Sequence, residues 1–253
     1  MPLFLFHGGD VVKEAVVLAS GVGKRLRTLT REIPKVFYRF VGCELVKYPM
    51  ISLMKNGVER FVMIVPEGYE DYGKKVLKDL GVEGVVIENS RVELGNAYSF
   101  FLSEPHVKSE RFFLSCGDSI FPPEALKNAF DEDEFHIKLG VSKRKDLIDP
   151  QEASKVLVDE NGRIVRIGKK VDEYNYFDTG VFIMTKKVYR LRDAFSWSEE
   201  ISLYQVLQKA VDLGMVVKVF DFEDAPWTEI DSPEDLNEKV YELMERIKEG
   251  IPC

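Results

Sequence analysis

The stretch from Ala15 to Lys35 (A-V-V-L-A-S-G-V-G-K-R-L-R-T-L-T-R-E-I-P-K) constrains the fold more than any other part of the chain. Its first residues, Ala15 to Ala19, form a short apolar run with the β-branched content of a buried parallel strand. Gly21 and Gly23 break the run where such a strand would end, and glycines there let the backbone approach a ligand closely. We therefore predict a strand followed by a tight ligand-binding loop.

The same segment concentrates positive charge in a protein whose formal net charge is −8. A local excess of cations beside a glycine loop is typical of a site for phosphate groups. The cations are Lys24, Arg25, Arg27, Arg31 and Lys35. Because no basic face is left once this cluster is assigned, the composition argues against a general nucleic-acid binder.

Two better-known glycine motifs do not fit this loop. The dinucleotide-binding fingerprint requires a third glycine at the position of Leu26, and the P-loop requires Gly-Lys-Ser/Thr after a four-residue gap, which is absent. These differences argue against a Rossmann dehydrogenase and a P-loop NTPase. An ordinary strand-to-helix turn remains an alternative interpretation of Gly-x-Gly with basic neighbours.

Helical and strand patterns alternate after this loop. Apolar spacing predicts helix, strand, helix, strand, helix and strand, in this order, at residues 49–55, 61–65, 70–80, 84–88, 96–104 and 112–116. This rhythm is typical of a parallel sheet covered on both faces. We expect an α/β fold with a Rossmann-like, mixed, mainly parallel sheet and helices on both faces.

The second half of the chain changes character. Two short alternating runs, Lys155 to Val158 and Arg163 to Ile167, flank Asn161-Gly162, which is a strong hairpin signal. They predict a small antiparallel lobe for a second substrate. Further helices and strands are expected at residues 123–130 (helix), 137–142 (strand), 180–185 (strand), 202–213 (helix) and 216–220 (strand).

No linker divides the chain, so we expect a single domain over residues 1–253. Within this domain we distinguish residues 14–135 from residues 136–231. A C-terminal helix over 232–249 would begin at the capped start Ser232-Pro233.

Two acidic residues are candidates to meet the glycine loop. Asp118 directly follows the strand predicted over 112–116, and Asp231 precedes a serine that can cap a helix, which leaves the Asp231 carboxylate available. Ligands bind beyond the carboxyl ends of strands in open parallel sheets, and Mg²⁺ accompanying nucleotide phosphates is usually held by one or two carboxylates. The alternative is that Asp118 only caps the following turn.

The cysteines and apolar runs bear on location. Three cysteines (Cys43, Cys116 and Cys253) give an odd count without metal-ligand spacing, which favours a reducing compartment over a disulfide framework. The run from Leu3 to Phe6 is too short for a signal-peptide core and suggests an extra strand or a loosely packed extension. No apolar run approaches the roughly 20 residues that span a bilayer. We expect a cytoplasmic chain, either complete or the cytosolic part of a protein attached to a membrane-embedded partner domain.

The spaced set L-A-S-G-V-G-K-R-L at 18–26 with Pro34-Lys35 resembles the signature of the sugar-nucleotidyltransferase superfamily, L-A-x-G-x-G-x-R-L followed by P-K. That family places metal-binding aspartates in a G-D context and in W-x-D-x-D-T/S-P-E-D-L, which 117–118 and 227–236 match, although Glu229 stands where many members carry another aspartate. The resemblance implies the nucleotidyltransferase fold and Mg²⁺ held by Asp118 and Asp231. It also implies that residues 14–135 form mainly the nucleotide-binding part and residues 136–231 mainly the acceptor-binding part.

The resemblance also implies a site for the nucleotide. Gly95-Asn96-Ala97 occupies the place of a small-residue turn that recognises the base, with Asn89 and Asn96 as the side chains that read it; the alternative is an ordinary loop with an N-cap at Asn96. The nucleotide-binding residues implied are Leu18, Ala19, Ser20, Gly21, Gly23, Asn89, Gly95, Asn96 and Ala97.

The acceptor part points to a subfamily. Many members carry Glu-Lys-Pro where this chain has Gly168-Lys169-Lys170. Its I-G-K, followed by D-T-G-V-F, resembles the inositol-1-phosphate cytidylyltransferases. These include the cytosolic half of bifunctional enzymes that make the osmolyte di-myo-inositol phosphate. The implied substrates are CTP and inositol 1-phosphate. The implied acceptor-binding residues are Lys169, Asp178, Thr179 and Gly180, and the implied catalytic residues are Arg25, Lys35 and Lys169.

Three competing functions stay open at this point. The same fold could serve a nucleotide-sugar pyrophosphorylase that uses UTP or dTTP, or a phosphocholine cytidylyltransferase. It could also serve a non-catalytic nucleotide-sensing module, but such a module would be expected to lack phosphate or metal ligands, which are all present here.

Overall fold

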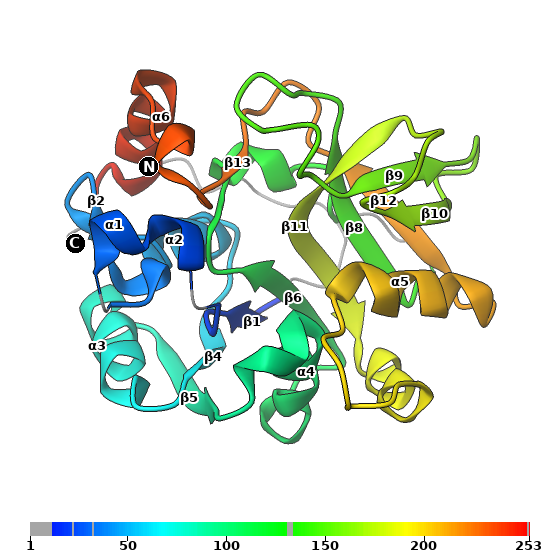
Figure 1. The fold of residues 1–253 in the computed structure, drawn as a ribbon, viewed down its shortest axis with the longest axis horizontal. Coiled ribbons are helices and arrows are strands. Elements are labelled where there is room, and N and C mark those ends of the chain that lie inside the picture. Colours follow the sequence, from blue (N-terminus) through cyan, green and yellow to red (C-terminus); the bar gives the residue numbers. More distant parts are fainter. Residues whose placement is uncertain (1–11, 22, 32, 131–133, 252) are drawn as a thin grey trace.

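The computed structural model describes residues 12–21, 23–31, 33–130, 134–251 and 253, so the expectation for Leu3 to Phe6 lies outside the described residues. Its centre is a nine-stranded mixed sheet (Figure 1). The sheet strands are β1 (Glu14–Leu18), β4 (Arg60–Pro66), β5 (Glu83–Asn89), β6 (Arg111–Cys116), β8 (Ile137–Ser142), β9 (Lys155–Val158), β10 (Ile164–Gly168), β11 (Tyr176–Thr185) and β12 (Val217–Asp221). The strand path is β10-β9-β11-β6-β1-β4-β5; β8 pairs with β11, and β12 with β8.

Two small antiparallel sheets and the helices complete the fold. The small sheets pair β2 (Arg39–Phe40) with β3 (Cys43–Glu44) and β7 (Ser119–Ile120) with β13 (Thr228–Glu229). The α-helices are α1 (Arg27–Thr30), α2 (Lys47–Met54), α3 (Glu70–Leu80), α4 (Gly95–Leu102), α5 (Leu203–Asp212) and α6 (Glu238–Lys248). The predicted α/β class with a mainly parallel sheet is confirmed.

The half of the sheet around β1 is parallel because β4, β1 and β6 pair in parallel and β5 continues the series. Side chains of β1 alternate between two cores: Ala15 and Val17 pack with α2, α3 and α6, whereas Val16 and Leu18 pack with α4 and α5. A strand buried on both faces needs such a continuous apolar run. Helices therefore cover both faces, as the sequence predicted.

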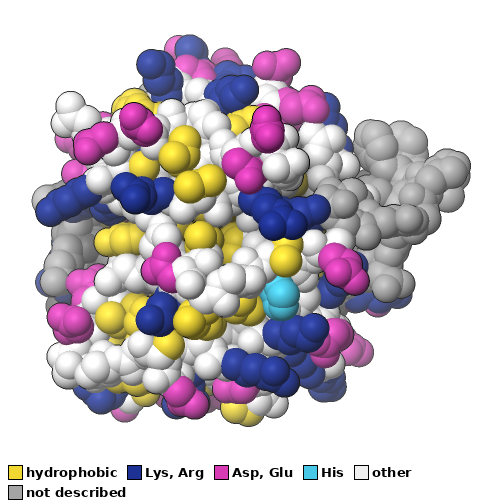
Figure 2. All heavy atoms as spheres, turned by 90° about the vertical axis from the view of Figure 1, so that its right-hand side faces the viewer, with side chains coloured by type: hydrophobic (Ala, Val, Ile, Leu, Met, Phe, Trp, Pro, Cys, Tyr) yellow, Lys and Arg dark blue, Asp and Glu magenta, His cyan; other side chains and the backbone are white. Residues whose placement is uncertain are grey.

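The other half of the sheet is built around β11, which runs antiparallel to β6, β8 and β9. The hairpin β9–β10 forms around Gly162 at φ 71°, as Asn161-Gly162 predicted. Because β9 also pairs with β11, this antiparallel lobe extends the main sheet. On the face over α5, β10 and β12, basic and acidic side chains are interspersed, so this face lacks the uniform positive charge of a nucleic-acid surface (Figure 2).

Two expected helices differ from the structure. Residues 123–130 form only a 3₁₀ turn, Pro123–Leu126, because Asn56 Nδ2 donates to the Pro123 carbonyl and the Lys127 N–H donates to Glu124, in the i to i+3 pattern. The C-terminal helix expected over 232–249 is present, but its predicted start was wrong. Ser232 caps a short 3₁₀ turn, and α6 begins at Glu238 with Asn237 as its own N-cap.

The expectation against a disulfide was wrong as well. Cys43 and Cys253 form a disulfide with a Cα–Cα distance of 5.1 Å, and Cys116 is free. Helix α6 brings them together because it packs on α2, where Lys55 Nζ donates to the Ile247 carbonyl. Among the described residues, no helix has the length and apolar character needed to cross a membrane.

Candidate active site

The pairing of β7 with β13 creates the centre of the site. Asp118 lies just before β7, and Asp231 follows β13 closely; the Ile230 N–H donates to the Asp118 carbonyl at 3.2 Å. Two aspartates that are far apart in sequence thus lie at the carboxyl end of β6, beside the loop that follows β1. Open parallel sheets bind their ligands at this end of the strands.

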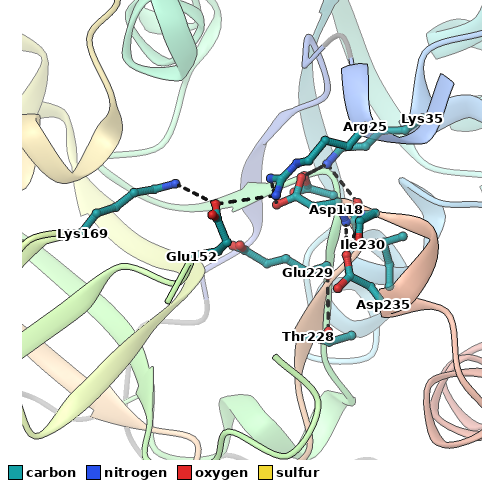
Figure 3. A network of polar contacts seen from close by, with 11 residues as sticks. Arg25, Lys35, Asp118, Glu152, Lys169, Thr228, Glu229, Ile230 and Asp235 are labelled. Atoms are coloured by element: carbon teal, nitrogen blue, oxygen red, sulfur yellow. Dashed lines mark hydrogen bonds and ion pairs between the residues drawn. The ribbon is translucent and has the colours of Figure 1, made fainter. Parts of the chain in front are cut away.

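Lys35 lies between the two aspartates. It begins a 3₁₀ turn (Lys35–Phe37), and its side chain is only 5% exposed. Its Nζ lies 2.5 Å from Asp118 Oδ2 and 2.6 Å from Asp231 Oδ1, and donates to the Ile230 carbonyl at 2.9 Å (Figure 3). The three ammonium protons therefore each have an oxygen acceptor, and the position of the charge is fixed.

The electrostatics follow from this arrangement. Burial alone would lower the pKa of Lys35, but the two carboxylates outweigh burial and raise its pKa above the usual range. Burial acts to raise the pKa of Asp231, but Lys35 and then Arg25 hold that pKa below its usual value. Lys35 and Asp231 therefore both keep their charges at neutral pH.

The glycine loop is shaped around Lys35. Gly23 has φ 55°, and a Cβ there would lie 2.9 Å from Cβ and Cγ of Lys35, so only glycine lets the lysine stem pass. Gly21 is exposed, and a Cβ there would meet nothing within 4 Å. The first glycine is thus not required by packing, and its backbone remains accessible to a ligand.

Arg25 and Lys169 approach the cluster from opposite sides. Arg25 Nη2 lies 3.1 Å from Asp231 Oδ2. Glu152 Oε2 lies 3.6 Å from Arg25 Nη1 and 3.8 Å from Lys169 Nζ, so this carboxylate connects the two cations (Figure 3). Sequence reasoning missed Glu152 because it lies in a polar loop without a pattern of its own.

A second group of carboxyls lies near β11 and β13. Asp178 accepts a hydrogen bond from the Gly180 N–H at 2.8 Å, and burial raises the pKa of Asp178 to about 6. Burial, followed by the neighbouring carboxyls of Asp118, Asp178 and Asp231, raises the pKa of Glu229 well above its usual value. The sequence left Glu229 without a role, and the structure places it in the same acidic cluster.

The rest of the predicted acceptor group is fixed by backbone contacts. Gly180 has φ 73°, and a Cβ there would lie 2.4 Å from Ser119 Oγ, so glycine is needed. The buried Thr179 hydroxyl donates to the Gly140 carbonyl at 2.8 Å. The Thr179 hydroxyl proton is therefore used in a hydrogen bond within the protein, and this hydrogen bond stabilises the sheet.

The predicted base-binding residues lie together but are engaged by the protein. The fully buried Asn89 contacts Ser99 and the Arg91 N–H. Asn96 Oδ1 accepts from the Leu203 N–H at 2.8 Å, and the Ala97 N–H donates to the Ile201 carbonyl at 3.1 Å. A Cβ on Gly95 would lie 2.4 Å from that same carbonyl. Direct base reading by these groups stays a prediction, and the hydrogen bonds join the turn to the start of α5.

Known proteins share this architecture. The family model described as nucleotidyl transferase matches residues 14–246. A structure described as the inositol-1-phosphate CTP transferase from T. maritima is 75% identical, covers 97% of this chain and 100% of that one, and superposes with a TM-score of 0.96. A putative glucose-1-phosphate thymidylyltransferase from Bacillus anthracis, 19% identical with 92% and 95% covered and a TM-score of 0.77, shares the fold.

Curated relatives are longer. The bifunctional IPC transferase and DIPP synthase of Aquifex aeolicus is 30% identical over 95% of this chain and 54% of that protein; its Archaeoglobus fulgidus counterpart is 30% identical over 98% and 47%. The chain thus spans about half the length of these relatives. Since the family model spans almost all of it, the chain belongs to the nucleotidyl transferase family.

Proposed function

We propose that this chain transfers CMP from CTP to inositol 1-phosphate, giving CDP-inositol and pyrophosphate. The observation that carries this proposal is the buried Lys35 held between Asp118 and Asp231, with Arg25 and Lys169 on either side. The 75% identical T. maritima protein, whose description names inositol 1-phosphate and CTP, supports this choice of substrates.

The reaction needs charge stabilisation and alignment more than proton transfer. An oxygen of the acceptor phosphate attacks the α-phosphorus of CTP, forms the new P–O bond and expels pyrophosphate as the bond to the β-phosphate breaks. That oxygen is anionic at neutral pH, so no general base is required. Holding two anions in line and neutralising the charge that develops on the α-phosphoryl group then provides most of the rate enhancement.

Each cation has a place in this scheme. Lys35 would stabilise the reacting phosphates, and Arg25, about half exposed beside Gly21 and Gly23, would bind the triphosphate. Lys169 would bind the acceptor phosphate. Asp178 and the backbone at Gly180 would bind hydroxyl groups of the ring, since carboxylates accept hydrogen bonds from hydroxyls.

The donor set fits the Mg²⁺ that we infer. Members of this family typically use a divalent metal. Lys35 Nζ binds Asp118 Oδ2 and Asp231 Oδ1, so a metal beside Lys35 would be held by the other oxygen of each carboxylate, of which Asp231 Oδ2 also faces Arg25. Among the described residues, no group of three or more His, Cys, Asp or Glu could hold a metal alone. Mg²⁺ often binds through one or two carboxylates together with water and substrate phosphates. When bound, it would neutralise phosphate charge and aid pyrophosphate departure.

A substrate matrix tests the proposal. CTP, UTP, dTTP and GTP are each combined with inositol 1-phosphate, glucose 1-phosphate or phosphocholine, and released pyrophosphate is measured with the mass of the product. We expect the highest turnover with CTP and inositol 1-phosphate, and a product with the mass of CDP-inositol. Preference for another pair would identify a different transferase, and nucleotide binding without turnover in any pair would favour the sensing module.

Cytoplasmic location and attachment to a membrane-embedded partner stay predictions. The half-length match to the bifunctional relatives is compatible with such an attachment. Cell fractionation of the protein expressed by its native host would test both.

A further inference from the structure

The layout of the site indicates where the nucleoside of the proposed CTP must lie. The phosphates are drawn to Lys35 and Arg25 at the ends of β1 and β6, and Lys169 takes the acceptor on the β11 side. The nucleoside must then extend to the other side of β1, over β4 and β5. The loop and helix that follow β5, residues 89–102, form the wall there (Figure 1).

A buried chain of hydrogen bonds lies in this wall. The Arg91 N–H donates to Asn89 Oδ1 at 2.8 Å, and Asn89 Nδ2 donates to Ser99 Oγ at 2.9 Å. Ser99 Oγ lies 2.7 Å from Ser20 Oγ. Asn89 and Ser99 are at most 1% exposed, whereas Ser20, 6% exposed, directly precedes the exposed Gly21. The chain thus runs from the protein interior to the edge of the nucleotide loop.

The direction of these hydrogen bonds can be worked out. A backbone N–H can only donate, so Arg91 fixes the oxygen of the Asn89 amide toward itself and the NH₂ group toward Ser99. Among the described residues, Ser99 Oγ has hydrogen bonds with Asn89 and Ser20. If Ser20 donated to Ser99, the Ser99 proton would be left without an acceptor in a buried place, which is costly. Ser99 therefore donates to Ser20, and the Ser20 proton points elsewhere.

We propose that Ser20 determines the choice of base: its hydroxyl, oriented by Ser99 and Asn89, donates a hydrogen bond to N3 of cytosine. This inference rests on the proposed function, because it assumes a cytidine nucleotide. N3 of cytosine accepts a hydrogen bond, whereas N3 of uracil carries a proton and would oppose the Ser20 proton. To accept from uracil instead, the Ser20 hydroxyl would have to turn its own proton away from the base, where at 6% exposure that proton has no acceptor among the described residues, and this cost disfavours the wrong base. Ser99 and Asn89 are positioning residues in this scheme.

The test compares CTP with UTP in the transfer to inositol 1-phosphate. Ser20→Ala is expected to lower the ratio of kcat/KM for CTP to that for UTP by roughly 10- to 100-fold, since the opposed donor is lost. Ser103→Ala is the matched control, because Ser103 is also a buried serine at helix α4 and donates to the Phe100 carbonyl. It should leave the ratio unchanged.

Two further measurements separate base reading from a structural effect. With 3-deaza-CTP, which lacks the N3 acceptor, wild type and Ser20→Ala should show equal kcat/KM. Ser99→Ala should lower the CTP to UTP ratio, and Ser99→Thr, which keeps the hydroxyl, should restore it. Asn89→Asp should lower the ratio as well, because an ionised carboxylate takes the Ser99 proton and lets Ser20 donate inward.

The outcomes distinguish this inference from the proposed function. If wild-type protein makes CDP-inositol but Ser20→Ala keeps the CTP to UTP ratio, the inference is wrong and the function stands. If Ser20→Ala lowers activity with 3-deaza-CTP as much as with CTP, Ser20 does not act through N3, and the inference is also overturned. If wild type makes no CDP-inositol, the proposed function itself fails.

Discussion

The two sides of the active site hold their cations in different ways. On the nucleotide side, Lys35 is 5% exposed and has three oxygen partners at 2.5 to 2.9 Å. On the acceptor side, Lys169 is 52% exposed, and its ion pair with Glu152 measures 3.8 Å. A buried cation with every proton bonded is preorganised, whereas an exposed lysine must lose side-chain freedom when the acceptor binds. We infer that the Lys35 side chain is already in position before CTP binds. The Lys169 side chain becomes ordered only when the acceptor phosphate binds.

The largest effect should come from Lys35→Ala, which removes the preorganised charge. We expect kcat for pyrophosphate release from CTP and inositol 1-phosphate to fall by roughly 10³-fold or more, because charge on the α-phosphoryl group loses its stabilisation. The variant should also lose about 1–3 kcal/mol of unfolding free energy, since two partly buried carboxylates are left without their cation. Steady-state kinetics and urea unfolding measure the two effects.

The chain contains a matched control for that substitution. Lys47 is also completely buried, and its Nζ lies 2.8 Å from Glu44 and 2.9 Å from Asp79, away from the active site. Lys47→Ala should destabilise the protein by a similar amount and retain kcat. Equal loss of kcat in both variants would mean that Lys35 acts through stability and not through chemistry.

The second largest effect should come from Lys169→Ala on the exposed side. We expect kcat/KM for inositol 1-phosphate to fall by roughly 10²-fold, mainly through KM, because the acceptor phosphate loses an ionic partner. Thermal stability should stay unchanged, since a half-exposed ion pair contributes little. Lys170→Ala is the control in the same exposed segment and should behave as wild type. A large rise in the KM for CTP with an unchanged acceptor KM would contradict the division of roles.

What the sequence could predict follows the same division. Local patterns predicted β1, the glycine loop and α3, whose predicted bounds, Glu70–Leu80, are those observed, because amphipathic spacing and the Gly81 C-cap are encoded within a few residues. The convergence of Asp118 with Asp231 followed from a family motif and from the rule for strand ends.

What the sequence missed depends on contacts between distant segments. Glu152 meets Arg25 and Lys169 only after the sheet has formed. Cys43 and Cys253 are 210 residues apart and meet through helix packing, which the count of cysteines cannot reveal. The start of the last helix was wrong because Ser232 and Asn237 are both good N-caps, and local sequence does not decide between them.

A smaller effect on stability should come from Asp178→Asn. The pKa of Asp178 in the folded protein is about 6, against 3.8 for the ordinary group, so the folded state binds the proton more tightly than the unfolded state. The contribution of this carboxyl is therefore most favourable below about pH 4 and is lost as the pH rises through about 6. Asparagine can keep the hydrogen bond from the Gly180 N–H without a charge.

The measurement is the free energy of unfolding against pH. At pH 7.5 the Asp178→Asn variant should be more stable than wild type by about 1–2 kcal/mol, a value reduced from the full shift because the carboxyl is only partly buried. The difference should shrink as the pH falls to 4. If the stability difference between the two proteins did not depend on pH, ionisation of Asp178 would not destabilise the folded protein at neutral pH. The contrast between the Lys35 side and the Lys169 side of the site would then be weaker.

The smallest effect should come from Glu152→Gln, where the two sides meet. The Glu152 carboxylate connects Arg25 and Lys169, so the triphosphate must replace it at Arg25 and the acceptor phosphate must replace it at Lys169. Removing its charge should lower KM for inositol 1-phosphate by roughly 2- to 5-fold at low ionic strength, since exposed ion pairs of this length are weak. This decrease in KM should vanish at about 0.5 M salt, where such ion pairs are screened.

Glu173→Gln provides the matched control, because Glu173 is an exposed glutamate of the acceptor-side half and has no ion pair among the described residues. It should leave KM unchanged. If Glu152→Gln raised KM instead, Glu152 would be holding Lys169 ready for the acceptor rather than competing with it. The acceptor side would then be preorganised in its own way, and the contrast with the Lys35 side would be one of exposure alone.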